Sequence, residues 1–463
     1  TLISAGTERS LVEFGRAGYL DKARQQPDKV KMVLDKVRTD GLMPTVEAVR
    51  SKLAEPMPMG YSNVGNVIEV GDGIEDLRVG DRVLSNGCHA DVVCVPRNLC
   101  APVPEGVEDE SAAFGVLGAI ALQGIRLAEP TLGETFVVTG LGLLGLLTVQ
   151  LLRANGCRVI GIDPDTTRLD LAESFGARVV RLDRGADPVS EAARITAGLG
   201  ADGVIVTASA RTDEIIHQAA TMCRKRGRVI LVGVVGLNLR RADFYEKELV
   251  FQVSCSYGPG RYDSAYEQEG QDYPLAFVRW TENRNFDAVL RLMDSGSLDV
   301  SRLVSDRYDI SAAHRAYARL IDDRDALGIV LRYPEAEREG QSRVIRSSAA
   351  LVTPTDRGGV VGAIGAGNYA GRVLLPAFKE AGARLKTVVS SQGLSGAHVA
   401  DRLSFEANST DVDAVLQDPE SDVVVIGTRH DSHARLVVSA LEAGKHVFVE
   451  KPMAMTTDEL NAI

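Results

Sequence analysis

Short apolar runs alternate with helix-like segments over two stretches of this chain. Between residues 131 and about 236 the apolar runs read VVTG, VIGID, RVVRLD, GVIVTAS and RVILVGVV. Apolar runs separated by helices are typical of a parallel sheet that has helices on both faces. A second alternation of the same kind begins at Gly359 and continues to the end of the chain. The pattern therefore predicts two doubly wound α/β domains.

Each alternation has a glycine-rich turn between its first strand and its first helix. The fingerprint positions are Gly140, Gly142 and Gly145 in the first turn, and Gly365, Gly367 and Ala370 in the second. In a G-x-G-x-x-G/A turn the first glycine makes the bend, the second lets backbone approach a pyrophosphate, and the third permits close helix–strand packing. The two turns therefore predict two nicotinamide dinucleotide sites.

The residue at the tip of the second strand distinguishes the two sites. Asp163 ends the second strand of the first alternation, where a ribose-binding carboxylate belongs, and it would repel a 2′-phosphate. NAD is therefore favoured over NADP at the first site. Ser390 and Ser391 occupy the corresponding tip in the second alternation. Because these residues neither repel nor clamp a 2′-phosphate, NAD and NADP stay open at the second site.

Composition and charge exclude several classes of partner. The net charge is −11, from 52 basic and 63 acidic residues, and no long basic run offsets it, so nucleic acid is disfavoured. No apolar stretch approaches the roughly 20 residues of a membrane helix. The 6 cysteines show no paired spacing, which favours a reducing compartment. We expect a cytoplasmic homo-oligomer that binds a small-molecule substrate and neither nucleic acid nor membrane.

The remaining segments complete the predicted domain plan. Glycine-broken β segments between residues 60 and 104 are typical of a small β-barrel, and a polar segment without periodicity precedes the second alternation. The chain begins without Met and ends in a helix-like segment, so we expect it to be trimmed at both ends. The predicted divisions are 1–125 for the barrel domain with a helical insertion at 19–57, 126–260 for the first dinucleotide domain, 261–333 for a return to the barrel domain, 334–357 for a linker, and 358–463 for the second dinucleotide domain.

A polar cluster follows the first alternation. The candidate substrate-binding residues are Tyr257, Arg261, Tyr262 and Asp263, and Tyr266, Glu267, Tyr273 and the run 279–282 come soon after. Arginine can hold a carboxylate or phosphate by two hydrogen bonds, and tyrosine rings can stack on sugar faces. The cluster therefore predicts a site for a polyhydroxylated or anionic ligand. The alternative is a surface loop held by its own ion pairs.

The first 335 residues resemble the medium-chain dehydrogenase/reductase family, the relatives of zinc alcohol dehydrogenase. The resemblance rests on the order of β segments, GDRV, the first glycine turn and VIGIDPDTTRLDLAESFGA. It implies a GroES-like β-barrel joined to a Rossmann domain.

The family's zinc-binding segments are altered in this chain. They match residues 5–8 and 60–62, where the cysteine has become Ala5 and the His-Glu pair has become Tyr61 and Ser62. Neither alanine nor serine offers a thiolate or imidazole, so we expect no metal. His89 beside Cys88 stands alone as a metal pair. Tyr61 becomes the candidate catalytic proton donor or acceptor, with barrel packing as its alternative role.

The last 105 residues closely resemble the glucose-fructose oxidoreductase and inositol dehydrogenase family, Gfo/Idh/MocA. The resemblance rests on the second glycine turn, the segment DVVVIGTRHDSHARLVVSALEAGKHVFVE and the ending Glu450-Lys451-Pro452. It implies a second Rossmann domain in which Thr428 and His433 belong to the segment that lines the cofactor cleft and Glu450 helps to bind the cofactor. It also implies catalytic roles for His433 and for Lys451, which lies beside nicotinamide and substrate.

Together the two parts resemble the bacterial bi-domain oxidoreductases, which the resemblance associates with sugar and polysaccharide metabolism. The main hypothesis is NAD(P)-dependent oxidation or reduction of a secondary alcohol or ketone in a sugar-like substrate, probed by offering the protein a panel of sugars. One alternative is a larger hydrophobic alcohol, as in tetrapyrrole-type relatives of the first domain. The other is a dinucleotide-binding sensor or scaffold without turnover.

Overall fold

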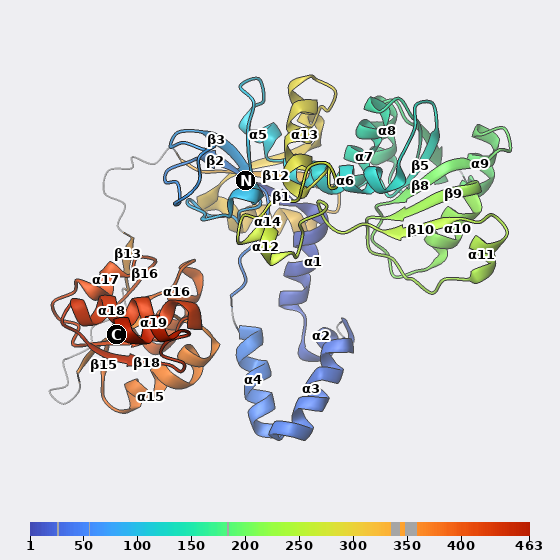
Figure 1. Ribbon diagram of the computed structural model, residues 1–463. Coiled ribbons are helices and arrows are strands. Elements are labelled where there is room, and N and C mark those ends of the chain that lie inside the picture. Colours follow the sequence, from blue (N-terminus) through green and yellow to red (C-terminus); the bar gives the residue numbers. More distant parts are fainter. Residues whose placement is uncertain (26, 55, 183–184, 335–342, 348–358) are drawn as a thin grey trace. The chain divides into compact units, whose positions relative to one another are not determined.

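The computed structural model describes residues 1–25, 27–54, 56–182, 185–334, 343–347 and 359–463 (Figure 1). The chain divides into two compact units, residues 1–18 with 59–334 and residues 19–58 with 335–463. The first unit contains the predicted barrel domain and the first dinucleotide domain. The second contains the helical insertion and the C-terminal sheet.

The largest sheet of the first unit has six parallel strands. Across the sheet their order is β10 (Val250–Val253), β9 (Cys223–Leu231), β8 (Ala201–Val206), β5 (Thr135–Thr139), β6 (Arg158–Asp163) and β7 (Arg178–Arg181). The chain runs outward from β5 to β7 and then returns to start again at β8. The strand order therefore reverses between β5 and β8, and folds of this kind bind ligands in the crevice outside that point.

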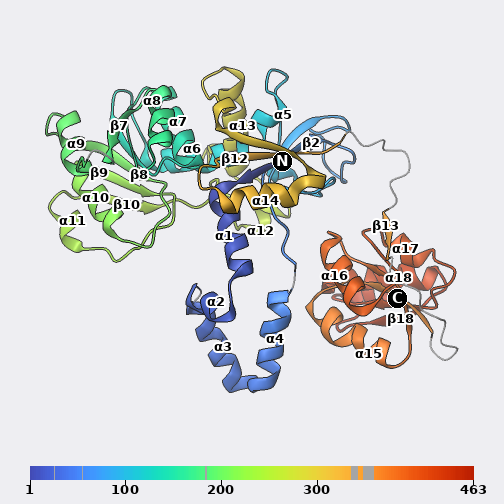
Figure 2. The same cartoon turned by 180° about the vertical axis from the view of Figure 1, so that it is seen from behind.

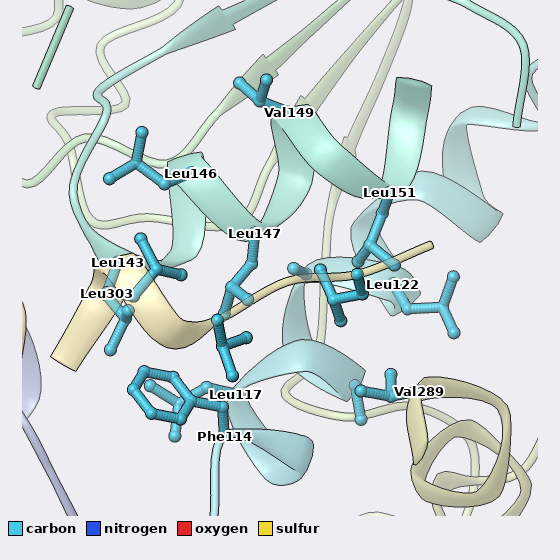
Figure 3. Close-up of a cluster of buried hydrophobic side chains, with 14 of the residues drawn as sticks. Phe114, Leu117, Leu122, Leu143, Leu146, Leu147, Val149, Leu151, Val289 and Leu303 are labelled. Carbon is cyan, nitrogen blue, oxygen red and sulfur yellow. The ribbon is translucent and has the colours of Figure 1, made fainter. Parts of the chain in front are cut away.

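Helices cover both faces of this sheet. They are α6 (Gly115–Ala128), α7 (Leu143–Ala154), α8 (Thr166–Ser174), α9 (Pro188–Ile195), α10 (Glu214–Met222) and α11 (Arg241–Tyr245). Alternate residues of β5 enter different cores, because Phe136 packs with the α6–α7 core and Val137 with the core under α9 and α10. Figure 3 shows Leu117 of α6 beside Leu147 of α7. This apolar packing fixes the position at which α7 begins.

The rest of the first unit is built on two three-stranded sheets. One has the order β1 (Leu2–Ser4), β12 (Gly328–Arg332), β11 (Val304–Asp309), and the other β2 (Asn63–Asn66), β3 (Arg82–Ser85), β4 (Cys100–Pro102). The helices of this part are α1 (Ala5–Arg16), α5 (Asp109–Ala112), α12 (Ser264–Glu267), α13 (Glu282–Asp294) and α14 (Ala313–Asp322). Figure 2 shows α14 beside the first of these sheets, against which Ala316 and Leu320 pack. One of the β segments expected between residues 60 and 104, ADVVCVP at 90–96, does not form a strand.

The second unit has its own six-stranded sheet. Its order is β13 (Val344–Arg346), β16 (Ala407–Ser409), β15 (Arg384–Val389), β14 (Val360–Ile364), β17 (Val423–Ile426) and β18 (His446–Val449), all parallel except β13. Its helices are α15 (Leu375–Glu380), α16 (Leu394–Leu403), α17 (Asp413–Leu416), α18 (His433–Glu442) and α19 (Thr457–Ala462), and a π-helical turn at Ala370–Leu374 precedes α15. The strand order reverses between β14 and β17, which places a second crevice there.

The helical insertion and the linker were both predicted for this unit. The insertion is helical as expected, with α2 (Tyr19–Gln25), α3 (Pro27–Asp40) and α4 (Leu42–Ala54). The predicted linker at 334–357 is wrong in part, because β13 within it extends the sheet by pairing with β16. Residues 335–342 and 348–358 of that prediction lie outside the described residues. No helix in the described ranges is long and apolar enough to span a membrane.

Candidate functional site

The first glycine turn has the geometry of a pyrophosphate-binding loop. Gly140 has a φ of +92°, and a Cβ there would lie 2.6 Å from the backbone of Ala208. A Cβ on Gly145 would lie 1.9 Å from the carbonyl oxygen of Gly140. A Cβ on Gly142, by contrast, would meet nothing within 4 Å. The first and third glycines are therefore required for packing, and the second leaves the start of α7 open to an anion.

Asp163 lies directly beside this turn. Its side chain is buried, and its carboxylate accepts hydrogen bonds from the backbone N–H of Leu141 at 2.6 Å and of Asp165 at 2.9 Å. A carboxylate has about four acceptor positions, so two are left for ribose hydroxyls. The free acceptor positions of Asp163 at the end of β6 suit an adenosine ribose, and its ribose-binding role stays a prediction.

The three residues at the lost zinc positions make other contacts. Ala5 is buried, and the hydroxyl of Ser62 donates to the carbonyl of Ala113 at 2.5 Å. The Tyr61 hydroxyl donates to Oγ1 of Thr7 at 3.3 Å. Burial raises the pKa of the Tyr61 phenol above its ordinary value, so this hydroxyl carries its proton at neutral pH. Among the described residues, no group of three or more His, Cys, Asp or Glu side chains is arranged to hold a metal.

A buried ionisable network lies beside these positions. Glu8 is 0 % exposed and accepts hydrogen bonds from the backbone N–H of Ser4 at 3.0 Å and the Tyr317 hydroxyl at 2.5 Å. Its Oε2 also lies 3.1 Å from Nε2 of His89, whose Nδ1 lies 2.8 Å from Oγ1 of Thr1. His89 is thus not isolated, because its ring is tied to a carboxylate. In sequence, Glu8 is simply the last residue of the altered segment 5–8, and nothing local marks it as buried.

The structure separates the four predicted substrate residues into two pairs. Tyr257 is buried with its hydroxyl 3.3 Å from Nδ2 of Asn86, and Arg261 pairs with Glu267 at 2.5 Å. Tyr262, by contrast, is 75 % exposed. Asp263 caps α12 and accepts a hydrogen bond from the Tyr273 hydroxyl. Tyr257 and Arg261 therefore face the interior, whereas Asp263 is committed to local structure.

The loop that carries these residues follows β10 at the carboxyl edge of the sheet, and its backbone is strained. Its non-glycine residues Ser256 (46°) and Tyr262 (67°) have positive φ, which side chains rarely allow, whereas Gly258 (121°) and Gly260 (107°) adopt positive φ at no steric cost. The start of α13 holds the loop, because the backbone N–H of Glu282 donates to Pro259 at 2.9 Å and Nδ2 of Asn285 donates to Tyr257 at 2.9 Å. Strained backbone of this kind clusters at functional sites.

Glu282, the last residue of the polar run 279–282, is a further candidate site residue that was not among the four predicted ones. Its side chain is 0 % exposed, and neither carboxylate oxygen has a hydrogen-bond partner among the described residues. The Nε of Arg261 is also buried without a partner. Burial first, and then Glu267, raise the pKa of Glu282 to about 8, against the opposing effect of Arg261. An unmet buried polar group costs about 1–3 kcal/mol, so this pair is suited to a hydroxyl-bearing ligand.

The local sequence around Glu282 indicates an exposed helix-terminal acid and not a buried site residue. Thr281 caps α13, so Glu282 is an acid in the first helical turn, where acids are ordinarily exposed and stabilise the helix dipole. Only the loop that folds over this helix end makes the carboxylate a buried group.

The second glycine turn repeats the design of the first. A Cβ on Gly365 would lie 2.6 Å from the backbone of Gly427, and a Cβ on Gly367 would meet nothing within 4 Å. Ala370 is buried, and its Cβ would lie 2.7 Å from one built on Gly427. The open second position fits a pyrophosphate, and the tight third position explains why a small residue stands there.

The predicted residues of the second site converge around His433. This side chain is fully buried, with Nδ1 2.8 Å from the carbonyl oxygen of Pro452 and Nε2 3.2 Å from that of Thr428. It thereby joins the turn containing Glu450 and Lys451 to the loop after β17. Lys451 itself is exposed. In this arrangement His433 holds the turn in place, and the catalytic role of Lys451 stays a prediction.

Family models match three parts of the chain. Residues 31–132 match the alcohol dehydrogenase GroES-like domain, and residues 144–269 match the zinc-binding dehydrogenases. Residues 360–463 match the Gfo/Idh/MocA oxidoreductase family with its NAD-binding Rossmann fold. These matches confirm the predicted bi-domain organisation and the nicotinamide dinucleotide as the type of cofactor.

Individual relatives resemble the first part of the chain. D-guloside 3-dehydrogenase of Escherichia coli K12 is 28 % identical over 274 residues, which cover 57 % of this chain and 73 % of the relative. Among solved structures, alcohol dehydrogenase TADH from Thermus sp. ATN1 superposes with a TM-score of 0.51 at 23 % identity, covering 63 % of this chain and 89 % of that one. Galactitol-1-phosphate dehydrogenase from Escherichia coli also has a TM-score of 0.51, at 19 % identity, covering 60 % and 86 %. At such identities the structural likeness shows the fold alone.

Proposed function

We propose that this chain, which joins the two domains of a zinc-type alcohol dehydrogenase to the nucleotide-binding domain of a Gfo/Idh/MocA oxidoreductase, oxidises or reduces a secondary alcohol or ketone of a sugar-like substrate with NAD(P). One observation carries the proposal. The open turn at Gly142 follows β5, and the loop that carries Arg261 follows β10 of the same sheet and is held against Glu282 at the start of α13.

The chemistry assigned to the first site needs a hydride and a proton. A bound nicotinamide would supply or accept the hydride. Tyr61 is protonated at neutral pH because burial raises its pKa, so it is suited to give a proton to the oxygen of a ketone during reduction. Thr7, which accepts the Tyr61 hydrogen bond, orients that hydroxyl. The proposed first site thus works without a metal ligand at positions 5 and 61–62.

The polar groups favour a sugar over a large hydrophobic alcohol. A hydroxyl can donate to Glu282 and accept from Nε of Arg261, and each bond removes the cost of an unmet buried group. A large hydrophobic alcohol would leave both groups unpaired. The relative named as a D-guloside dehydrogenase acts on a sugar derivative by its name, which supports the same choice.

The direct test is steady-state NADH formation with a panel of sugars and sugar alcohols. We expect turnover with at least one polyhydroxylated substrate and none with a hydrophobic alcohol of similar size. Tight dinucleotide binding without turnover on any member of the panel would instead favour a sensor or scaffold.

A further inference from the structure

Two arginines lie against the chain's only tryptophan. The guanidinium carbon of Arg126, on α6, is 3.4 Å from the ring centre of Trp280, and that of Arg279 is 3.9 Å from it. Arg126 and Trp280 are half-buried, whereas Arg279 is exposed. Two cations therefore share one aromatic ring in the segment that leads into α13.

Neither of these two cations has an acidic partner among the residues that the structure describes. Neighbouring arginines are paired, Arg261 with Glu267 and Arg284 with Asp272. Within the described part of the chain, neither Arg126 nor Arg279 forms an ion pair. Burial first, and then Arg279, lower the pKa of Arg126 to about 10, and no carboxylate offsets them. Half-burying a cation beside another cation is unfavourable unless an anion joins them.

The pair retains hydrogen-bond donors for such an anion. Nε of Arg126 donates to Oδ1 of Asn285 at 2.7 Å, and this is the guanidinium's only hydrogen bond to a described residue. A guanidinium has five N–H donors, so four are left on Arg126. Arginine forks match the planar oxygens of a carboxylate or phosphate.

Asn285 connects this pair to the proposed substrate site. Its Nδ2 donates to the carbonyl of Tyr257 at 2.9 Å, while its Oδ1 accepts from Arg126. One residue thus holds both the strained loop and the unpaired cation. The group of Arg261, Glu267 and Glu282 contains two carboxyls and one guanidinium, so it suits neutral hydroxyls, whereas Arg126 and Arg279 supply positive charge.

We propose that Arg126 and Arg279 bind an oxyanion, a phosphate or a carboxylate, carried by the hydroxylated substrate of the first site. The inference rests on the proposed function for the identity of the substrate, but the anion site can be tested without turnover.

Trp280 reports on the site because no other tryptophan contributes to the emission. The protein is saturated with NAD to fill the dinucleotide sites and titrated with inorganic pyrophosphate while tryptophan fluorescence is followed. We expect a saturable change, with the dissociation constant raised at least about tenfold in Arg279→Gln and in Arg126→Gln, since a charged hydrogen bond is lost. Arg279 is exposed, so its variant should fold normally even if the Arg126 variant does not.

Arg241→Gln is the matched control, because Arg241 also lies over an aromatic ring, 3.8 Å from the centre of Tyr245. It should leave pyrophosphate affinity unchanged. Equal affinities in Arg279→Gln and Arg241→Gln, or no saturable change in the unmodified protein, would overturn the proposal.

A second measurement separates this inference from the proposed function and identifies the anion. KM is compared for methyl glucoside, glucose 1-phosphate and glucuronate, in the unmodified protein and in Arg279→Gln. We expect the variant to raise KM for one or both anionic sugars and not for the neutral one. If the sugars are turned over but Arg279→Gln changes none of the three KM values, the proposed anion site is wrong and the proposed function stands. If pyrophosphate binds beside Trp280 but no sugar is turned over, the anion site stands and the proposed function is wrong.

Discussion

The carboxylate of Asp163 accepts a hydrogen bond of 2.6 Å from the backbone N–H of Leu141, inside the first glycine turn. The bond holds a negative charge at the end of β6, beside the position at which a dinucleotide ribose would lie. The acidic group is therefore fixed in place before any cofactor arrives.

This contact predicts that the first site prefers NADH to NADPH, because the fixed carboxylate accepts from ribose hydroxyls and repels a 2′-phosphate. Asp163→Ser should narrow the difference in affinity measured by calorimetry. Asp165→Ser is the control, since Asp165 caps α8 and should affect stability and not cofactor choice. Equal affinities in the unmodified protein would contradict the assignment.

Glu282 predicts a loss of stability as the pH rises. Its pKa is raised from 4.5 to about 8, so between these values the folded protein keeps a proton that the unfolded chain has released. The free energy of unfolding therefore falls with rising pH across this window. At about 1.4 kcal/mol per pKa unit the loss reaches roughly a few kcal/mol above the folded pKa.

Glu282→Gln keeps the neutral form at every pH. It should be more resistant to urea than the unmodified protein above about pH 8, and the two should converge near pH 4.5. Asp287→Asn, on the exposed side of the same helix, should show no such dependence. A Glu282→Gln variant that is less stable by the same amount at all pH values would refute the burial argument.

Tyr61→Phe removes the proposed proton donor without changing the packing of the ring. We expect kcat for ketone reduction to fall by roughly 10² to 10⁴ with little change in KM, since general acid catalysis contributes about that much. Tyr262→Phe makes the same change at an exposed position and should be silent. If Tyr61→Phe and Tyr262→Phe reduce the ketone at similar rates, Tyr61 has only a packing role.

Lys451 is expected to exchange a proton with the reacting hydroxyl at the second site. Lys451→Ala should abolish turnover at that site and keep dinucleotide affinity within a few-fold. Lys451→Arg retains the charge but cannot release a proton in the working range, so it should be inactive as well. Activity in the arginine variant would show that charge alone is needed.

The replaced ligands at Ala5, Tyr61 and Ser62 predict that the purified protein holds no stoichiometric zinc. Elemental analysis checks this directly, with activity measured before and after a chelator. If the protein holds about one tightly bound zinc per chain, and a chelator removes both the zinc and the activity, the prediction is wrong.

The sequence by itself determined the two Rossmann domains, their glycine turns and Asp163. These features are local in sequence, because strand, turn, helix and strand follow one another and the glycine spacing lies within a single βαβ unit. The residues that mark the dinucleotide sites could be named for the same reason.

Only the tertiary structure decided which polar residues of 256–282 face the interior. Tyr262 and Asp263 look equivalent to Tyr257 and Arg261 in sequence, but the strained loop turns the first outward and uses the second as a helix cap. Glu282 is buried because that loop folds over α13, and Arg126 meets Trp280 across more than a hundred residues of chain. Burial and long-range pairing depend on which segments meet, and a single local pattern does not encode that.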